Sequence, residues 1–156
     1  SYGLKGETRF PREVPNDGAD AVLILQGIND IIHPVVEDVN LFRPMSDLPT
    51  AQELISGLTQ YIYMARRLGY RVYMGTLMPI GGWRTDAPFR QTLRHEVNRF
   101  IRTTDLLDGF VDFDRALEDP ERPDHLLAAY DSGDHLHPSP AGYRRMAMEV
   151  PKELLK

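Results

Sequence analysis

The sequence has no cysteine and only one tryptophan among its 156 residues. Without cysteine the chain cannot form disulfides, thiolate zinc sites or a thiol nucleophile, although this absence leaves the cellular compartment open. No apolar run approaches the roughly 18 residues of a membrane span, and the first residues contain no apolar stretch of signal-peptide length. The net charge is −5 without a long run of one sign, which argues against nucleic acid and anionic membranes as partners.

The chain has the composition of one folded domain. Hydrophobic residues make up 42% and charged residues 26%, and no repeat, low-complexity segment or linker divides the sequence. We therefore expect a single domain over residues 1–156. Gly3, Gly6, Pro11 and Pro15 predict that residues 1–19 form an extended arm along the surface rather than a helix or strand.

Three short apolar segments predict β-strands, at residues 20–26, 71–78 and 109–114. The first is continuously apolar, which predicts burial on both faces. Helical patterns predict three helices, which cover about residues 51–68 after a Thr50–Glu53 capping box, a stretch starting near Asp86 or Pro88, and about 140–150 with Met146, Ala147 and Val150 inward.

Strands that alternate with helices predict an α/β fold with an open, mostly parallel sheet and helices on both faces. Ligands of such sheets bind beyond the carboxyl ends of the strands. That rule selects three loops, at residues 27–30, 79–85 and 114–139.

The densest polar cluster is the segment from Tyr130 to Pro138, in which two residues separate Asp134 from His137. A carboxylate at this spacing can orient the imidazole, which then takes a proton from a hydroxyl nucleophile. The residues alone leave two other interpretations open. The acidic and histidine side chains could only cap a helix and fix a turn, or His135 and His137 could bind a metal ion.

Gly27-Ile-Asn-Asp30 follows the first predicted strand. Glycine permits a sharp turn there, and the Asn29 amide could donate a hydrogen bond to an oxyanion, although the same residues also suit a simple turn. Trp83 could line an acyl or sugar site, or serve packing alone.

The two motifs together, G-x-N-D and then D-x-x-H-P before the last helix, resemble the GDSL or SGNH hydrolase family. The resemblance runs from about Arg9 to the C-terminus. Five segments are similar to a carbohydrate-esterase-like branch of the family: Gly27–Ile31, Thr76–Pro79, Val97–Arg102, Val111–Asp114 and Ala129–Pro138.

This resemblance implies a flavodoxin-like three-layer α/β/α sandwich without a cofactor. It implies that Asn29 donates a hydrogen bond to the oxyanion, that His137 is the general base and that the Asp134 carboxylate orients His137. Gly27 and Asp30 would be supporting residues. The implied activity is that of a serine esterase, which hydrolyses a carboxylic ester through an acyl-enzyme. The substrate would be a small ester, such as an acetylated carbohydrate.

The family's nucleophilic serine, in a Gly-Asp-Ser block after the first strand, has no counterpart among the five serines of the chain, at positions 1, 46, 56, 132 and 139. The resemblance therefore implies that the N-terminal strands and the serine lie outside this sequence, so that the chain alone is inactive. The strand at Ala21–Leu25 would then have an unpaired edge. We expect a missing N-terminal segment, a second copy of the chain or residues 1–19 to cover it.

Two alternatives to the esterase hypothesis come from other functional classes. One is a non-catalytic remnant of the fold that binds a ligand or partner. The other is a metal-dependent hydrolase that uses His135 and His137.

Overall fold

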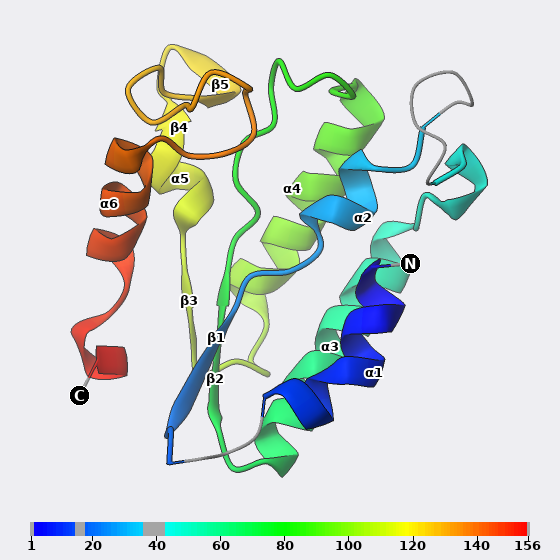
Figure 1. Ribbon diagram of the computed structural model, residues 1–156, viewed down its shortest axis with the longest axis vertical. Coiled ribbons are helices and arrows are strands. Elements are labelled where there is room, and N and C mark those ends of the chain that lie inside the picture. The colour runs from blue at the N-terminus through cyan, green and yellow to red at the C-terminus, as the bar shows by residue number, and fades with distance from the viewer. Residues whose placement is uncertain (1, 15–17, 36–42, 156) are drawn as a thin grey trace.

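The computed structural model describes residues 2–14, 18–35 and 43–155 (Figure 1). The elements follow in the order α1 (Tyr2–Glu13), β1 (Ala21–Ile24), α2 (Ile28–Ile32), η1 (Met45–Asp47), α3 (Ala51–Arg67), β2 (Arg71–Gly75), α4 (Pro88–Thr103), β3 (Gly109–Val111), α5 (Phe113–Leu117), β4 (Glu118–Asp119), β5 (Arg122–Leu126), α6 (Pro140–Glu149) and η2 (Lys152–Leu155). No helix among the described residues is long and apolar enough to cross a membrane.

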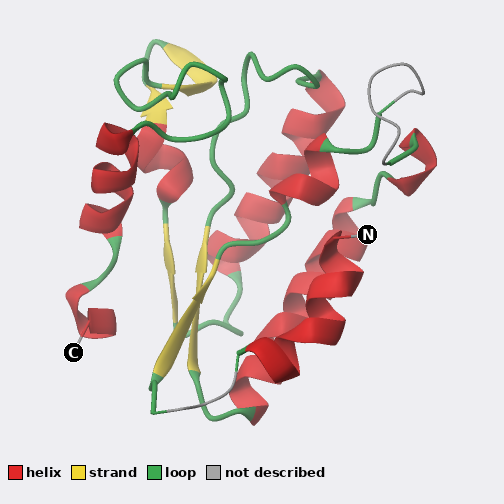
Figure 2. Ribbon diagram, viewed as in Figure 1, coloured by secondary structure: helices red, strands yellow, loops and turns green. Residues whose placement is uncertain are grey.

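The three predicted strands form one parallel sheet in the order β1-β2-β3, which confirms the α/β prediction. Ala21 lies opposite Arg71 in this register, and Met74 lies opposite Phe110. Helices α3 and α4 connect successive strands and lie on one side of the sheet, while α6 lies on the other side in this view (Figure 2).

Local signals in the sequence fix the ends of the long helices. The hydroxyl of Thr50 accepts a hydrogen bond from the backbone N–H of Glu53 at 3.2 Å, and the Glu53 carboxylate accepts one from the backbone N–H of Thr50 at 2.8 Å. This is the capping box that the sequence predicts for α3. Gly69 ends the same helix with a φ of 88°. Pro88 begins α4.

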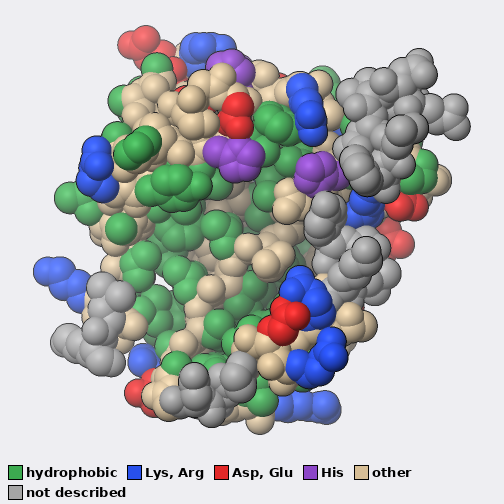
Figure 3. Space-filling model, in the orientation of Figure 1, with side chains coloured by type: hydrophobic (Ala, Val, Ile, Leu, Met, Phe, Trp, Pro, Cys, Tyr) green, Lys and Arg blue, Asp and Glu red, His purple; other side chains and the backbone are tan. Residues whose placement is uncertain are grey.

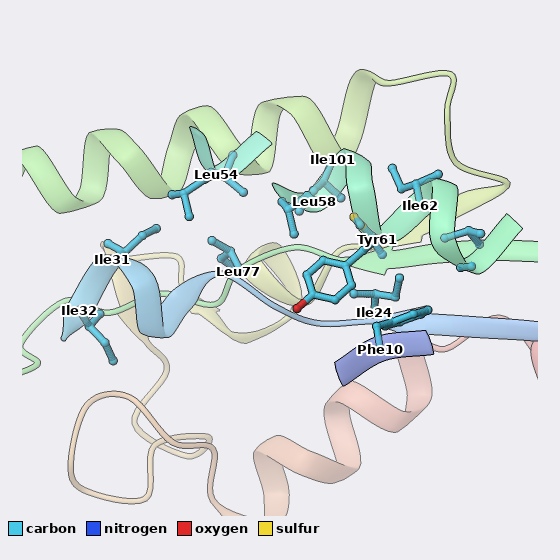
Figure 4. Packing of buried hydrophobic residues seen from close by; sticks show 14 of the residues in the cluster. Phe10, Ile24, Ile31, Ile32, Leu54, Leu58, Tyr61, Ile62, Leu77 and Ile101 are labelled. Carbon is cyan, nitrogen blue, oxygen red and sulfur yellow. The ribbon is translucent and has the colours of Figure 1, made fainter. Parts of the chain in front are cut away.

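The main core lies between the sheet and the helices α1, α2, α3 and α4. Val72 and Met74 of β2 meet Ile62 of α3 and Val97 of α4, and each of these four side chains is at most 1% exposed. Figure 4 shows the same layer from close by, with Tyr61 between Leu77 and Phe10. Each such buried side chain stabilises the fold by about 1.5–3 kcal/mol.

The expectation of an extended arm over residues 1–19 is wrong, because residues Tyr2–Glu13 form the helix α1. Phe10 is 7% exposed and packs edge-on against Tyr61, with ring centroids 5.3 Å apart. The absence of a side chain at Gly6 allows α1 to approach the Tyr61 hydroxyl. Packing against α3 therefore outweighs the low helix propensity of the glycines and of Pro11.

Burial of β1 on both faces is also not observed. Ile24 is the only buried residue of β1, and the following Leu25 is 37% exposed. The reason is that β1 is an edge strand, with no second partner strand among the described residues. Figure 3 shows hydrophobic side chains gathered over the middle of this face of the molecule.

The C-terminal part differs from the prediction in two ways. Residues 114–139 are not only a loop, because they contain most of α5 and the antiparallel pair β4 and β5. Helix α6 packs on α5, and Gly142 is its only buried residue. Ala147, expected to point inward, is exposed, and Met148 is 79% exposed. The apolar residues of α6 therefore have little to cover them among the described residues.

Candidate active site

The loop that carries the predicted Asp and His lies above the carboxyl ends of the sheet strands, between β5 and α6 (Figure 1). An antiparallel bridge between Asp131 and Pro138 closes the loop, and the backbone N–H of Ser132 donates to the carbonyl of His137 at 3.0 Å. Ser139 then caps α6 by accepting a hydrogen bond from the Gly142 N–H. The loop is thus held at both ends by backbone contacts.

Asp134 and His137 form the pair that the sequence predicts. Oδ2 of Asp134 lies 2.6 Å from Nδ1 of His137. An ionised carboxylate only accepts hydrogen bonds, so Nδ1 carries the proton and donates it. The Nε2 atom therefore has a free lone pair, and it has no hydrogen-bond partner among the described residues. The His137 side chain is 62% exposed, so an incoming hydroxyl can reach it.

Hydrogen bonds keep Asp134 ionised. Desolvation raises its pKa, but the His137 side chain and the backbone N–H groups of His137 and Leu136 outweigh this effect and hold the pKa well below its usual range. The hydroxyl of Ser132 also donates to this carboxylate, at 3.1 Å. The charge that orients the imidazole is therefore present at neutral pH.

A second imidazole–carboxylate pair, which was not predicted from the sequence, lies in the same loop. Oδ2 of Asp131 lies 2.6 Å from Nδ1 of His135, and its Oδ1 accepts backbone hydrogen bonds from Gly133 and His135. Burial raises the pKa of Asp131, but these hydrogen bonds lower it below its usual value. The i, i+4 spacing of Asp131 and His135 was the signal available in the sequence.

The loop after β2 meets this cluster from the side. The ring of Trp83 lies edge-on to that of His137, with centroids 6.4 Å apart and an interplanar angle of 89°. A Cβ atom at Gly82 would lie 3.3 Å from the His135 ring, so glycine permits the two loops to approach closely. The guanidinium of Arg84 lies over the Trp83 ring, 4.8 Å from its centroid. Trp83 thus borders the site.

The predicted oxyanion residue lies at the start of α2. Gly27 precedes the helix with a φ of 115°, a conformation that favours glycine. Asn29 is exposed, and its amide has no hydrogen-bond partner in the described part of the chain. Asp30, by contrast, is 6% exposed and forms an ion pair with Arg43 at 3.6 Å. The structure therefore leaves the Asn29 amide available, but no contact joins it to the Asp134–His137 pair.

A buried polar network, which was not predicted from the sequence, holds together the elements next to the site. Arg94 is fully buried and bonds to the carboxylates of Asp114 and Asp124. The carbonyl of Asp124 accepts a hydrogen bond from the Gly81 N–H at 2.7 Å. This network fixes the β4–β5 hairpin to α4 and to the loop that carries Trp83. Its members are far apart in the sequence, so no local pattern indicates it.

The described residues contain no set of ligands for the metal ion that the second interpretation requires. In residues 2–14, 18–35 and 43–155, no group of three or more His, Cys, Asp or Glu side chains is arranged to hold a metal ion. His135 and His137 instead bind two different carboxylates.

The sequence profile of the GDSL-like Lipase/Acylhydrolase family matches residues 2–145. The chain belongs to this family. None of the curated proteins compared with it gives a match. The family membership confirms the resemblance drawn from Gly27–Ile31 and Ala129–Pro138, and it places the chain in a family of hydrolases.

Solved structures share the fold. A protein described as an acylhydrolase from Bacteroides fragilis superposes with a TM-score of 0.71 at 19% identity, over 98% of this chain and 69% of the other. A GDSL-like lipase from Bacteroides thetaiotaomicron gives 0.71 at 17% identity, over 98% and 70%. Axe2, an acetylxylan esterase from Geobacillus stearothermophilus, gives 0.70 at 23% identity, over 97% and 67%. These likenesses confirm the α/β/α fold class.

Proposed function

We propose that the chain carries the acid–base half of a serine esterase active site. His137 is the general base, Asp134 orients it and Asn29 donates to the oxyanion. The observation that carries the proposal is the 2.6 Å contact between Asp134 and Nδ1 of His137, which leaves Nε2 exposed. Gly27 sets the turn before Asn29, and Asp30 anchors α2 through Arg43.

In this mechanism Nε2 of His137 takes the proton of a serine hydroxyl while the oxygen attacks the ester carbonyl. The imidazolium then protonates the leaving alcohol, which leaves an acyl-enzyme. Water attacks the acyl-enzyme with the same base, and the serine is released with the carboxylic acid. The Asn29 amide stabilises the oxyanion of both tetrahedral intermediates, a contribution of about 3 kcal/mol for one donor.

We place the nucleophilic serine outside this chain. Each serine with a described side chain has another position: Ser46 lies on η1, Ser56 on α3, Ser132 donates to Asp134 and Ser139 caps α6. None of their hydroxyl groups forms a hydrogen bond with the imidazole of His137 in the described structure. A serine-to-alanine variant of Axe2 is described as a catalytic mutant, which supports the same chemistry here.

The unpaired edge of β1 is a place where an additional segment of the protein could bind. Leu25, which follows β1, is 37% exposed, so an apolar side chain lies beside the unpaired edge. An added strand would pair with β1 and bury this side chain. We propose that the nucleophile-bearing segment binds here, and that without it the chain is inactive. A second copy of the chain is the other candidate for this edge.

The substrate that we propose is a carboxylic ester, and an acetylated carbohydrate is the class to test first. The acetylxylan esterase activity named for Axe2 supports this choice, as does the aromatic surface of Trp83 beside His137.

The test is hydrolysis of p-nitrophenyl acetate by the protein with its N-terminal segment. We expect His137→Ala to remove nearly all activity and Asp134→Asn to lower kcat by a factor on the order of 10⁴. His95→Ala is the matched control, because the His95 side chain is half-exposed and pairs with Asp124 rather than with Asp134 or His137, and it should retain most activity. Full activity in His137→Ala would reject the proposal. An inactive but folded parent protein would favour the non-catalytic alternative.

A further inference from the structure

A cavity separate from the Asp134–His137 loop opens between α1 and α3. Its volume is about 620 Å³, within the range of small-molecule sites. Its walls come from these two helices, from η1 and from the turn before α2, and no residue of the loop 131–138 lines it. Figure 1 shows α1 and α3 side by side, with α2 and η1 at their upper ends.

The buried guanidinium of Arg43 lies at one wall of the cavity, and the residue is 6% exposed. Its Nη1 atom lies 3.6 Å from Oδ1 of Asp30 and its Nε atom lies 3.5 Å from Oδ2 of Asp47, so both carboxylates pair with its charge. Neither nitrogen forms a hydrogen bond with a described residue. A buried donor without an acceptor is costly, so these atoms favour a ligand that supplies an oxygen.

The lining of the cavity also has carboxylate acceptors. The carboxylate of Glu7 on α1 reaches over Gly57 of α3, where a Cβ atom would lie 3.0 Å from Oε1. Burial, and secondly the charge of Asp30, raise the pKa of Glu7. Glu53 and Asp47 add two more carboxylates, so four carboxylates and one guanidinium are found among the described lining residues. An anionic ligand is disfavoured by this balance.

The floor between these groups is apolar. Leu54, Leu58 and Tyr61 of α3 line it and belong to the hydrophobic core. Figure 4 shows the three side chains in sequence along α3. An apolar surface edged by polar groups suits a ligand with both kinds of surface, such as the C–H face and hydroxyl edge of a sugar ring.

We propose that this cavity binds a neutral saccharide. A hydroxyl group both donates and accepts, so one sugar can donate to the carboxylates of Glu7 and Asp30 and accept from Arg43. The proposal does not depend on the esterase reaction, because binding requires neither the Asp134–His137 pair nor a nucleophile.

The test is NMR titration of this chain with cellobiose, a neutral disaccharide. We expect saturable shifts in residues that line the cavity, and weaker binding of digalacturonate, its acidic counterpart. Gly57→Ala places a methyl group in the cavity and should weaken cellobiose binding about tenfold. The substitution also raises helix propensity, so the variant should fold.

A second variant tests the role of the guanidinium. Arg43→Met should weaken cellobiose binding at least about tenfold, whereas the matched control Arg67→Met, at an exposed position of α3, should not change it. No saturable shift with cellobiose, or equal affinity in the parent chain and Gly57→Ala, would overturn the proposal. Tighter binding of a diamino disaccharide than of cellobiose would also overturn it, because the cavity would then select a cation.

Discussion

The indole of Trp83 lies edge-on to the imidazole of His137, with ring centroids 6.4 Å apart. Trp83 is the only tryptophan of the chain, so its fluorescence reports on this one contact. The two residues come from the loops after β2 and β5, and their contact joins the loops at the proposed site.

We predict that the fluorescence of Trp83 changes when the imidazole at position 137 is removed, because the two rings are in contact. The emission spectrum of His137→Gln should therefore differ from that of the parent chain at the same pH. His135→Gln is the control and should change the spectrum much less. An unchanged spectrum in His137→Gln would mean that the two rings are not in contact in solution.

A second prediction concerns Asn29. Its amide has no partner in the described structure, so Asn29→Ala should leave the melting temperature nearly unchanged. In the protein with its N-terminal segment, the same change should lower kcat by about 10²–10³ with little change in KM, because the oxyanion forms only in the transition state. An unchanged kcat would remove Asn29 from the mechanism.

A third prediction follows from the lowered pKa of Asp134. A carboxylate whose pKa is lower in the folded state stabilises the fold above its unfolded pKa of about 3.9, and this contribution is lost as the pH falls toward the folded value. The parent chain should therefore be more stable than Asp134→Asn near pH 7, and the difference should shrink below about pH 4.

Thermal unfolding of both proteins measures this difference. The measurements should run from about pH 3 to about pH 7, a range that includes the unfolded pKa of Asp. Asp105→Asn is the control, because Asp105 is exposed, and its difference from the parent should vary much less with pH. A constant difference between the parent and Asp134→Asn would show that the hydrogen bonds to Asp134 do not persist in solution.

Short-range patterns gave most of the correct predictions. The capping box at Thr50 fixes the start of α3, and apolar runs identify the three strands of the sheet. The Asp134–His137 pair forms within one tight loop, so its spacing made the contact possible, and the family resemblance selected it among the three interpretations. The Asp131–His135 pair is equally local, but the sequence analysis considered these residues only as a cap, a turn or metal ligands.

The missed features depend on contacts between distant parts of the chain. Helix α1 forms because Phe10 packs on Tyr61, some fifty residues away in the sequence, and local glycines and prolines predict the opposite. The buried position of Arg94 depends on Asp124, which a hairpin brings back to α4. Trp83 was only a candidate until the fold placed it beside His137.

The most direct test of the account is labelling with a fluorophosphonate, which reacts with an activated serine and is located by peptide mass spectrometry. We predict one adduct in the protein with its N-terminal segment, on a serine that precedes residue 1 of this sequence, and its loss in His137→Ala. The chain 1–156 alone should not react. An adduct on Ser132, which donates to Asp134 rather than to His137, or on any other serine of this chain would contradict the account.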